Sequence, residues 1–238
     1  NIYFYGSIEG VNMGNITIYH GSSKIVENPK LGEGKTYNDY GQGFYCTESM
    51  ELAKEWACTD NVQGYANKYE LNLTNLKVLD LSDEKYTILN WIAILMENRI
   101  VNLSTSLQKQ AKEYLIENFL PDYKNYDVII GYRADDAYFL FARAFVSNEI
   151  SLSQLGLAMK LGKLGVQYCI KSEKAFNQLK FLDYVVANNV VYYNKKKNRD
   201  ETARNEYLKE ITNFDLDGIY MMDIIKEGMK NGDKRLRF

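Results

Sequence analysis

The order of strand-like and helix-like segments restricts the fold of this sequence more than any other feature. Alternating or short apolar runs typical of β-strands occur at residues 16–19, 43–47, 65–73, 76–81, 126–132 and 165–172. Runs typical of helices occur at about residues 84–99, 104–119, 134–147, 151–162 and 173–182. This order lacks the regular alternation of a doubly wound sheet, so it predicts an α+β fold.

Capping patterns and the tail add local detail. Thr47 is expected to cap a helix that carries Glu48 and Glu51 in its first turn, where carboxylates stabilise the N-terminus. Ser172 is expected to cap the helix at 173–182 in the same way. In the tail, we expect a β-like piece at 184–194, a charged helix at 196–211 and a last amphipathic helix at 218–230.

Composition and charge narrow the possible functions. The 238 residues are 46% hydrophobic, which is ample for a core, and the net charge is −2, whereas nucleic-acid-binding domains usually carry a basic excess. The longest apolar runs are too short to span a bilayer, so no membrane is expected as a partner. The three cysteines, Cys46, Cys58 and Cys169, form no C-x-x-C motif, which favours a reduced, cytoplasmic protein. Cys46 and Cys169 are expected to face the core.

The first residues resemble the remnant of a protease-cleavage tag, because the chain begins with NIYFYGS. We therefore exclude residues 1–12 from the fold and take Met13 as the natural start.

Several ordinary motifs are set aside. GEGKT at 32–36 is not a phosphate-binding P-loop, because Pro29 stands where that loop needs its first glycine and has no N–H to offer. With one histidine and three scattered cysteines, no metal site is expected. The run Lys195–Lys197 is interpreted as the solvated face of a helix rather than as a nucleic-acid contact.

Three strand-borne fragments together resemble a known family. They are YHGS at 19–22, GQGFYCT at 41–47 and VQYCI at 166–170, and they are similar to the signature strands of the ADP-ribosyltransferase fold, of the diphtheria-toxin and poly(ADP-ribose) polymerase type. More closely, the chain resembles the bacterial domain-of-unknown-function family 3990, an ADP-ribosyltransferase-like family. Further matching pieces, in order within residues 16–181, are Pro29, AKEWA at 53–57, YDVIIGYRADD at 126–136 and LKF at 179–181.

The resemblance implies an α+β fold with a split antiparallel β-sheet core and surrounding helices. Residues 13–181 would form this ADP-ribosyltransferase-like domain, and residues 182–238 would form a mostly helical C-terminal extension. The resemblance also implies NAD as the co-substrate, bent in a cleft between two half-sheets, with no metal.

The resemblance assigns the first contacts with NAD to the strand that contains the only histidine. His20 would hydrogen-bond the adenosine ribose, and the main chain of Gly21 would grip the nicotinamide amide, which requires a residue without Cβ at close range. Ser22 would add a hydroxyl contact.

The second signature strand would hold the nicotinamide ring. Tyr45 would stack on this ring, and either Tyr37 or Phe44 would cover its other face. Gly43 would also belong to the binding site.

The third signature strand carries Gln167 where the fold usually places a glutamate. An amide orients the ribose but lacks a full negative charge, so a single transfer or hydrolysis is favoured over chain elongation. Asp135 and Asp136 are the best candidates for a compensating carboxylate, although acids at this position also suit the first turn of a helix. Arg133 is a candidate for pairing with the pyrophosphate, and a surface role is favoured for it.

The resulting functional hypothesis is a mono-ADP-ribosyltransferase that cleaves NAD and modifies a macromolecular acceptor, left open between protein and nucleic acid. The family resembles toxins of toxin–antitoxin or phage-defence modules, so a neutralising partner protein is expected. Two alternatives use the same pocket: an NAD glycohydrolase, and a non-catalytic module that binds NAD or ADP-ribose.

Overall fold

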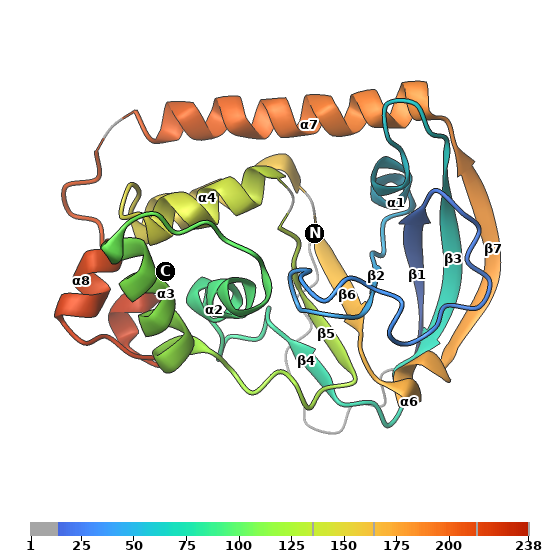
Figure 1. The fold of residues 1–238 in the computed structure, drawn as a ribbon, viewed down its shortest axis with the longest axis horizontal. Coiled ribbons are helices and arrows are strands. Elements are labelled where there is room, and N and C mark those ends of the chain that lie inside the picture. The colour runs from blue at the N-terminus through green and yellow to red at the C-terminus, as the bar shows by residue number, and fades with distance from the viewer. Residues whose placement is uncertain (1–13, 135, 164, 213, 238) are drawn as a thin grey trace.

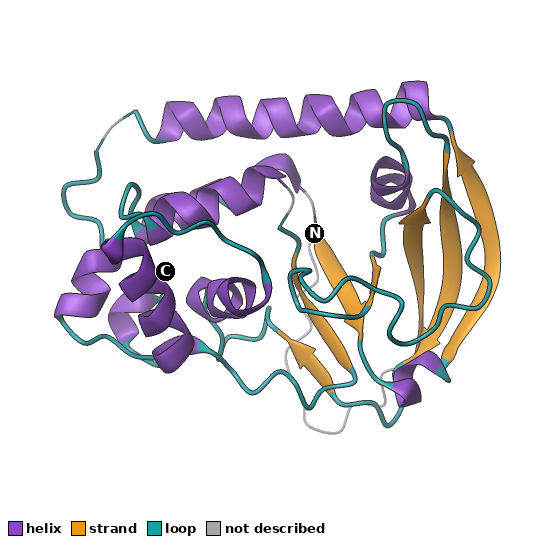
Figure 2. Ribbon diagram, in the orientation of Figure 1, coloured by secondary structure: helices purple, strands orange, loops and turns teal. Residues whose placement is uncertain are grey.

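The structure is a computed structural model that describes residues 14–134, 136–163, 165–212 and 214–237. It contains two β-sheets with helices interspersed along the chain (Figure 2). The predicted α+β class is therefore confirmed. The expected tag remnant at residues 1–12 lies outside the described residues.

The first sheet, called sheet A, has three antiparallel strands. They are β1 (Asn15–Ser22), β3 (Gly64–Asn72) and β7 (Leu179–Ala187), in the order β1-β3-β7. The register places His20 opposite Asn67, and a bulge interrupts the pairing of β3 with β7 between Lys68 and Tyr69. Ile18 and Tyr69 point from this sheet into a small apolar core.

The second sheet, called sheet B, has four strands. They are β2 (Phe44–Cys46), β6 (Val166–Ile170), β5 (Val128–Tyr132) and β4 (Val78–Asp80), in the order β2-β6-β5-β4. The pairs of β6 with β2 and with β5 are antiparallel, but β4 and β5 are parallel. The expectation of a purely antiparallel core is therefore wrong for this pair, because two helices cross over between β4 and β5.

The two sheets touch where β1 meets the segment after β2. The backbone groups of Tyr19 and Thr47 exchange two hydrogen bonds, of 2.7 and 2.9 Å. Thr47 is therefore part of this bridge. The sequence pattern predicted that Thr47 would cap the next helix, and this prediction is wrong. Ser49 caps it instead, since its hydroxyl accepts the N–H of Leu52 at the start of α1 (Met50–Ala57).

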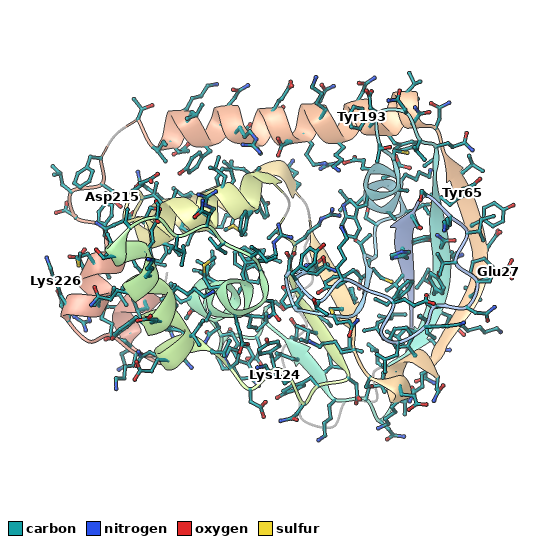
Figure 3. The ribbon with its side chains drawn as sticks, in the orientation of Figure 1. Glu27, Tyr65, Lys124, Tyr193, Asp215 and Lys226 are labelled. Atoms are coloured by element: carbon teal, nitrogen blue, oxygen red, sulfur yellow. The ribbon has the colours of Figure 1, made fainter. Side chains whose placement is uncertain are left out.

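A group of helices packs beside sheet B and holds most of the core (Figures 1 and 3). These helices are α2 (Ile88–Asn98), α3 (Ser106–Phe119), α4 (Asp136–Val146), α5 (Leu152–Ala158) and α8 (Met221–Lys226), with 3₁₀ turns at Leu161–Lys163 and Lys234–Leu236. Helix α2 is buried from Leu89 to Met96, as expected for a helix at the centre of a core. Helix α8 is shorter than the predicted 218–230, because Gly228 follows it with a positive φ of 61° and ends it.

The largest difference from the predicted elements lies after Ser172. Ser172 caps a helix as expected, but α6 (Glu173–Phe176) is short, and Leu179 begins β7. Pairing with β3 and packing of Phe181 on Tyr69, with ring centroids 5.7 Å apart, stabilise a strand where the local pattern favours a helix. Strand β7 spans Leu179–Ala187 and therefore crosses position 181, where the sequence analysis ended the domain and began the C-terminal extension.

A long helix then runs from the side of sheet A to the helical side of the molecule. Strand β7 ends at Ala187, and the side chain of Asn188 caps α7 (Asn189–Glu210), so the expected β-like piece at 184–194 is helical from residue 189. Helix α7 passes from β7 and α1 to the helical side of the molecule (Figure 1). Arg199 holds it to α1 through two hydrogen bonds to the buried carboxylate of Glu55, of 2.7 and 2.9 Å.

Within the part of the chain that the structure describes, no helix combines the length and the apolar character needed to cross a bilayer.

The Arg199–Glu55 pair yields a stability prediction. Arg199→Ala should lower the free energy of unfolding by about 3 kcal/mol, because it leaves a buried carboxylate without its bidentate partner. The matched control is Lys197→Ala on the same helix. The side chain of Lys197 is 61% exposed and its ammonium lies 4.0 Å from Glu201, so the substitution should change the free energy of unfolding by less than about 0.5 kcal/mol. Urea denaturation measures both, and equal effects of the two variants would contradict the assignment.

Candidate functional site

A pocket of about 610 Å³ lies where sheets A and B meet. Its walls come from β1, β2, β6 and α1, from the loop between β1 and β2, and from the residues that follow α2 and β5. The structure brings six of the sequence-predicted site residues to this pocket: His20, Gly21, Gly43, Phe44, Tyr45 and Gln167. The three signature fragments therefore contribute to one cavity, although they are up to about 150 residues apart in the sequence.

His20 connects the two sheets with its side chain. Its Nδ1 lies 2.7 Å from the carbonyl oxygen of Tyr45, and its ring stacks on Phe44 at a centroid distance of 4.2 Å. Burial lowers the pKa of His20, although the hydrogen bond to Tyr45 opposes this shift. Because a carbonyl oxygen can only accept, Nδ1 carries the hydrogen, and Nε2 of the neutral ring is a hydrogen-bond acceptor. His20 is one of the residues that line the pocket.

Gly21 is required first of all by the packing of α1 on β1. A Cβ at this position would lie 2.1 Å from the carbonyl oxygen of Ala53 and 2.9 Å from the nitrogen of Ala57. The glycine was expected to allow close approach of a ligand, but the packing of α1 requires it in any case.

The main chain of Gly21 nevertheless faces the pocket. Successive residues of a strand direct their N–H and C=O groups to alternate sides, so those of Gly21 point to the same side as those of Tyr19. Tyr19 bonds to Thr47, away from β3, and Gly21 therefore offers one donor and one acceptor on the side of β2.

Tyr45 is held rigidly in the wall by its hydroxyl. This group donates to the carbonyl oxygen of Gly41 at 2.6 Å and accepts the N–H of Tyr40 at 3.0 Å. Burial raises the pKa of Tyr45, so the phenol stays neutral. Only the ring of Tyr45 is thus left to contact a ligand.

The neighbouring Cys46 and Cys169 are fully buried, which confirms that they face the core.

Gln167 is fixed by a carboxylate that the sequence analysis missed. Its Nε2 donates to Oδ2 of Asp39 at 2.8 Å and to the carbonyl oxygen of Tyr132 at 3.2 Å. Oδ2 of Asp39 also accepts the N–H of Ala134 at 2.8 Å, and its Oδ1 lies 3.3 Å from Arg99. The only available signal for Asp39 was its position directly before the YGQGFYCT segment.

Asp39 is buried, and its partners favour the charged form of its carboxyl group. Burial raises its pKa, while the N–H of Ala134, the amide of Gln167 and the guanidinium groups of Arg99 and Arg133 oppose the rise. The N–H of Ala134 and the two guanidinium groups cannot accept a hydrogen from a protonated carboxyl group. The amide of Gln167 presents its NH₂ group to Asp39, because the same nitrogen also donates to the carbonyl oxygen of Tyr132. The ionised form of Asp39 therefore fits the site at neutral pH.

The rest of the lining is rich in cations and contains a tryptophan. The charged residues around the pocket are Lys30, Glu33, Lys35, Asp39, Arg99 and Arg133. Arg133, for which a surface role was favoured, lies in the wall with its guanidinium 3.8 Å from the ring centroid of Trp56 on α1. Four cations against two carboxylates give the pocket an excess of positive charge, which suits an anionic ligand.

Two of the remaining sequence-predicted residues lie outside the wall, and the other two are not described. Among the described residues, the pocket lining includes neither Ser22, whose hydroxyl accepts the N–H of Lys24, nor Tyr37, whose side chain is 45% exposed. Asp135 lies outside the described residues, and Asp136 is the first residue of α4, with a side chain that the structure does not describe.

Comparisons with known proteins give one result. Residues 16–181 match the family described as protein of unknown function (DUF3990), which is more than half of the chain. Neither the curated proteins nor the solved structures contain a match to this sequence.

The single imidazole allows a direct test of the site. NMR of the folded protein should show His20 titrating below its ordinary pKa of about 6.5, with the hydrogen on Nδ1 at neutral pH. The unfolded chain takes up a proton near the ordinary pKa and the folded chain only at lower pH. The free energy of unfolding should therefore fall as the pH is lowered through this range.

The control is His20→Asn, which retains a donor near the carbonyl of Tyr45 but has no titrating ring. Its stability should depend less on pH than that of the wild type between about pH 7.5 and pH 5.5. An imidazole pKa at or above the ordinary value, or a hydrogen on Nε2 alone, would contradict the assignment of Nε2 of His20 as a hydrogen-bond acceptor.

Proposed function

The chain belongs to the DUF3990 family, and we propose that it binds NAD⁺ in this pocket, breaks the bond between nicotinamide and ribose, and transfers ADP-ribose to a macromolecular acceptor. The observation that carries the proposal is the convergence of His20, Tyr45 and Gln167, from three separate strands, on one cavity. The resemblance of this arrangement to the ADP-ribosyltransferase fold is part of the proposal.

The charge of the pocket supports a dinucleotide as the ligand. NAD⁺ carries two negatively charged phosphates, and Lys30, Lys35, Arg99 and Arg133 lie in the lining. Guanidinium groups match phosphate oxygens in geometry as well as in charge. A volume of about 610 Å³ also falls in the ordinary range for sites of small molecules and cofactors.

The polar groups at the junction of the sheets suit the two ends of NAD⁺. Nε2 of His20 can accept a hydrogen bond from a ribose hydroxyl, because its other nitrogen is committed to Tyr45. The N–H and C=O of Gly21 can bond to the carboxamide of nicotinamide, which needs one donor and one acceptor. The ring of Tyr45, immobilised by its hydroxyl, provides a flat apolar face for the nicotinamide ring.

The proposed reaction separates neutral nicotinamide from a ribose that becomes positively charged. The electron pair of the broken bond stays on the ring nitrogen of nicotinamide, and an acceptor oxygen or nitrogen then forms the new bond to the ribose carbon and loses its proton. The carbonyl dipole of Gln167, with the charge of Asp39 behind it, would favour the positive ribose. The contribution of an amide is smaller than that of a carboxylate, which favours one transfer over repeated chain growth.

Nicotinamide release tests the proposal. The wild-type protein, incubated with NAD⁺, should release nicotinamide, and with labelled NAD⁺ and cell lysate it should label a macromolecule. His20→Asn should reduce the rate about tenfold or more, because it removes the acceptor Nε2 while it keeps a donor for Tyr45. Lys197→Gln, on the outer side of α7, is the control and should leave the rate unchanged.

Other outcomes separate the alternatives. Free ADP-ribose without any labelled macromolecule would favour an NAD glycohydrolase over a transferase. Binding of NAD⁺ in calorimetry without release of nicotinamide would favour a non-catalytic module. Absence of binding would overturn the assignment of the pocket. The neutralising partner protein stays a prediction from the family resemblance.

A further inference from the structure

We propose that Asp39 is a positioning residue, which fixes the amide of Gln167 so that its carbonyl oxygen faces the ribose of bound NAD⁺. This inference rests on the proposed function. It adds to the site a buried carboxylate, from the loop between β1 and β2, that the sequence pattern did not indicate.

The orientation of the Gln167 amide follows from its neighbours. Its terminal nitrogen lies between Oδ2 of Asp39 and the carbonyl oxygen of Tyr132, at 2.8 and 3.2 Å. An ionised carboxylate and a backbone carbonyl can only accept, so both must face the NH₂ end of the amide. The opposite orientation would bring the oxygen of Gln167 against two acceptors, and Oε1 is therefore directed away from Asp39.

Asp39 is itself immobilised, which makes it suitable for this role. It is 5% exposed, and its two oxygens are engaged by the N–H of Ala134, the amide of Gln167 and the guanidinium of Arg99. Because these partners occupy both oxygens, Asp39 acts on the ligand through Gln167 rather than by direct contact.

The same contact explains an amide at position 167. A glutamate there would place a second carboxylate beside Asp39, and two carboxylates in hydrogen-bond contact share a proton because both cannot ionise. A protonated glutamate would donate its O–H to Asp39 and present its C=O to the ribose, as the amide does. The amide supplies this arrangement at every pH, without a proton that must be retained.

The kinetic test compares four proteins by nicotinamide release and by the Kd for NAD⁺. Asp39→Asn and Gln167→Met should each lower kcat about 10- to 100-fold. Gln167→Met should have a small effect on Kd, whereas Asp39→Asn should also change Kd, because Asp39 pairs with Arg99, a proposed phosphate contact. The double variant should be no slower than Gln167→Met alone, since Asp39 has no amide left to orient. Urea denaturation of all four measures any loss of folding separately.

A pH profile provides a readout that a purely structural role would not change. Gln167→Glu should be active at acid pH, where the shared proton is retained. It should lose activity as the pH rises, because loss of this proton leaves two carboxylates that repel each other, and the glutamate is then no longer held in position. The wild type should lack this loss on the alkaline side.

The side-chain amide signals of Gln167 give a readout without any reaction. They are identified by their disappearance in Gln167→Met, and they should shift in Asp39→Asn, whereas those of the distant Gln108 should not. No release by the wild type overturns the proposed function and this inference with it. Release by the wild type combined with full activity of Asp39→Asn, additive losses in the double variant, or unshifted Gln167 signals overturns the inference alone.

Discussion

The hydrogen bond from His20 to the main chain of Tyr45 is the interaction on which the site depends most. It crosses from sheet A to sheet B, next to the backbone bridge between Tyr19 and Thr47. Together with this bridge, the hydrogen bond of His20 sets the separation of β1 and β2 and therefore the width of the pocket between them. A side chain that joins the sheets and also lines the pocket couples the integrity of the fold to the geometry of the site.

The local pattern of the sequence predicts the pocket-forming strands well, because alternation and small residues are local signals. It fails for β7, where residues 179–182 suit a helix and become a strand only through pairing with β3. It also fails for Asp39 and Trp56, which lie in a loop and on a helix and reach the site only after both sheets have formed. Gly21 shows a further limit, since the pattern identifies the residue but not the clash with Ala53 that requires it.

The electrostatics of the pocket are organised by burial. His20 is held neutral and Asp39 ionised, although burial disfavours the charged form of both, because only Asp39 is surrounded by donors and cations. The partners of Asp39 must be placed by folding itself: Arg99 follows α2, Ala134 follows β5 and Gln167 lies on β6. Removal of one partner from a buried carboxylate lowers the stability of a protein much more than removal of a partner from a surface carboxylate.

An amide backed by a carboxylate differs in its chemistry from a carboxylate alone. Electrostatic attraction falls with distance. Asp39 lies behind the amide of Gln167, so its charge is further from the proposed ribose than the charge of a glutamate at position 167 would be. It therefore stabilises a developing positive charge less. In exchange, the amide is always in the correct protonation state and its orientation is fixed by two acceptors. Such a site favours precise placement of a reactive sugar over strong stabilisation of its charge. For the proposed reaction, this difference favours one transfer over repeated addition to a growing chain.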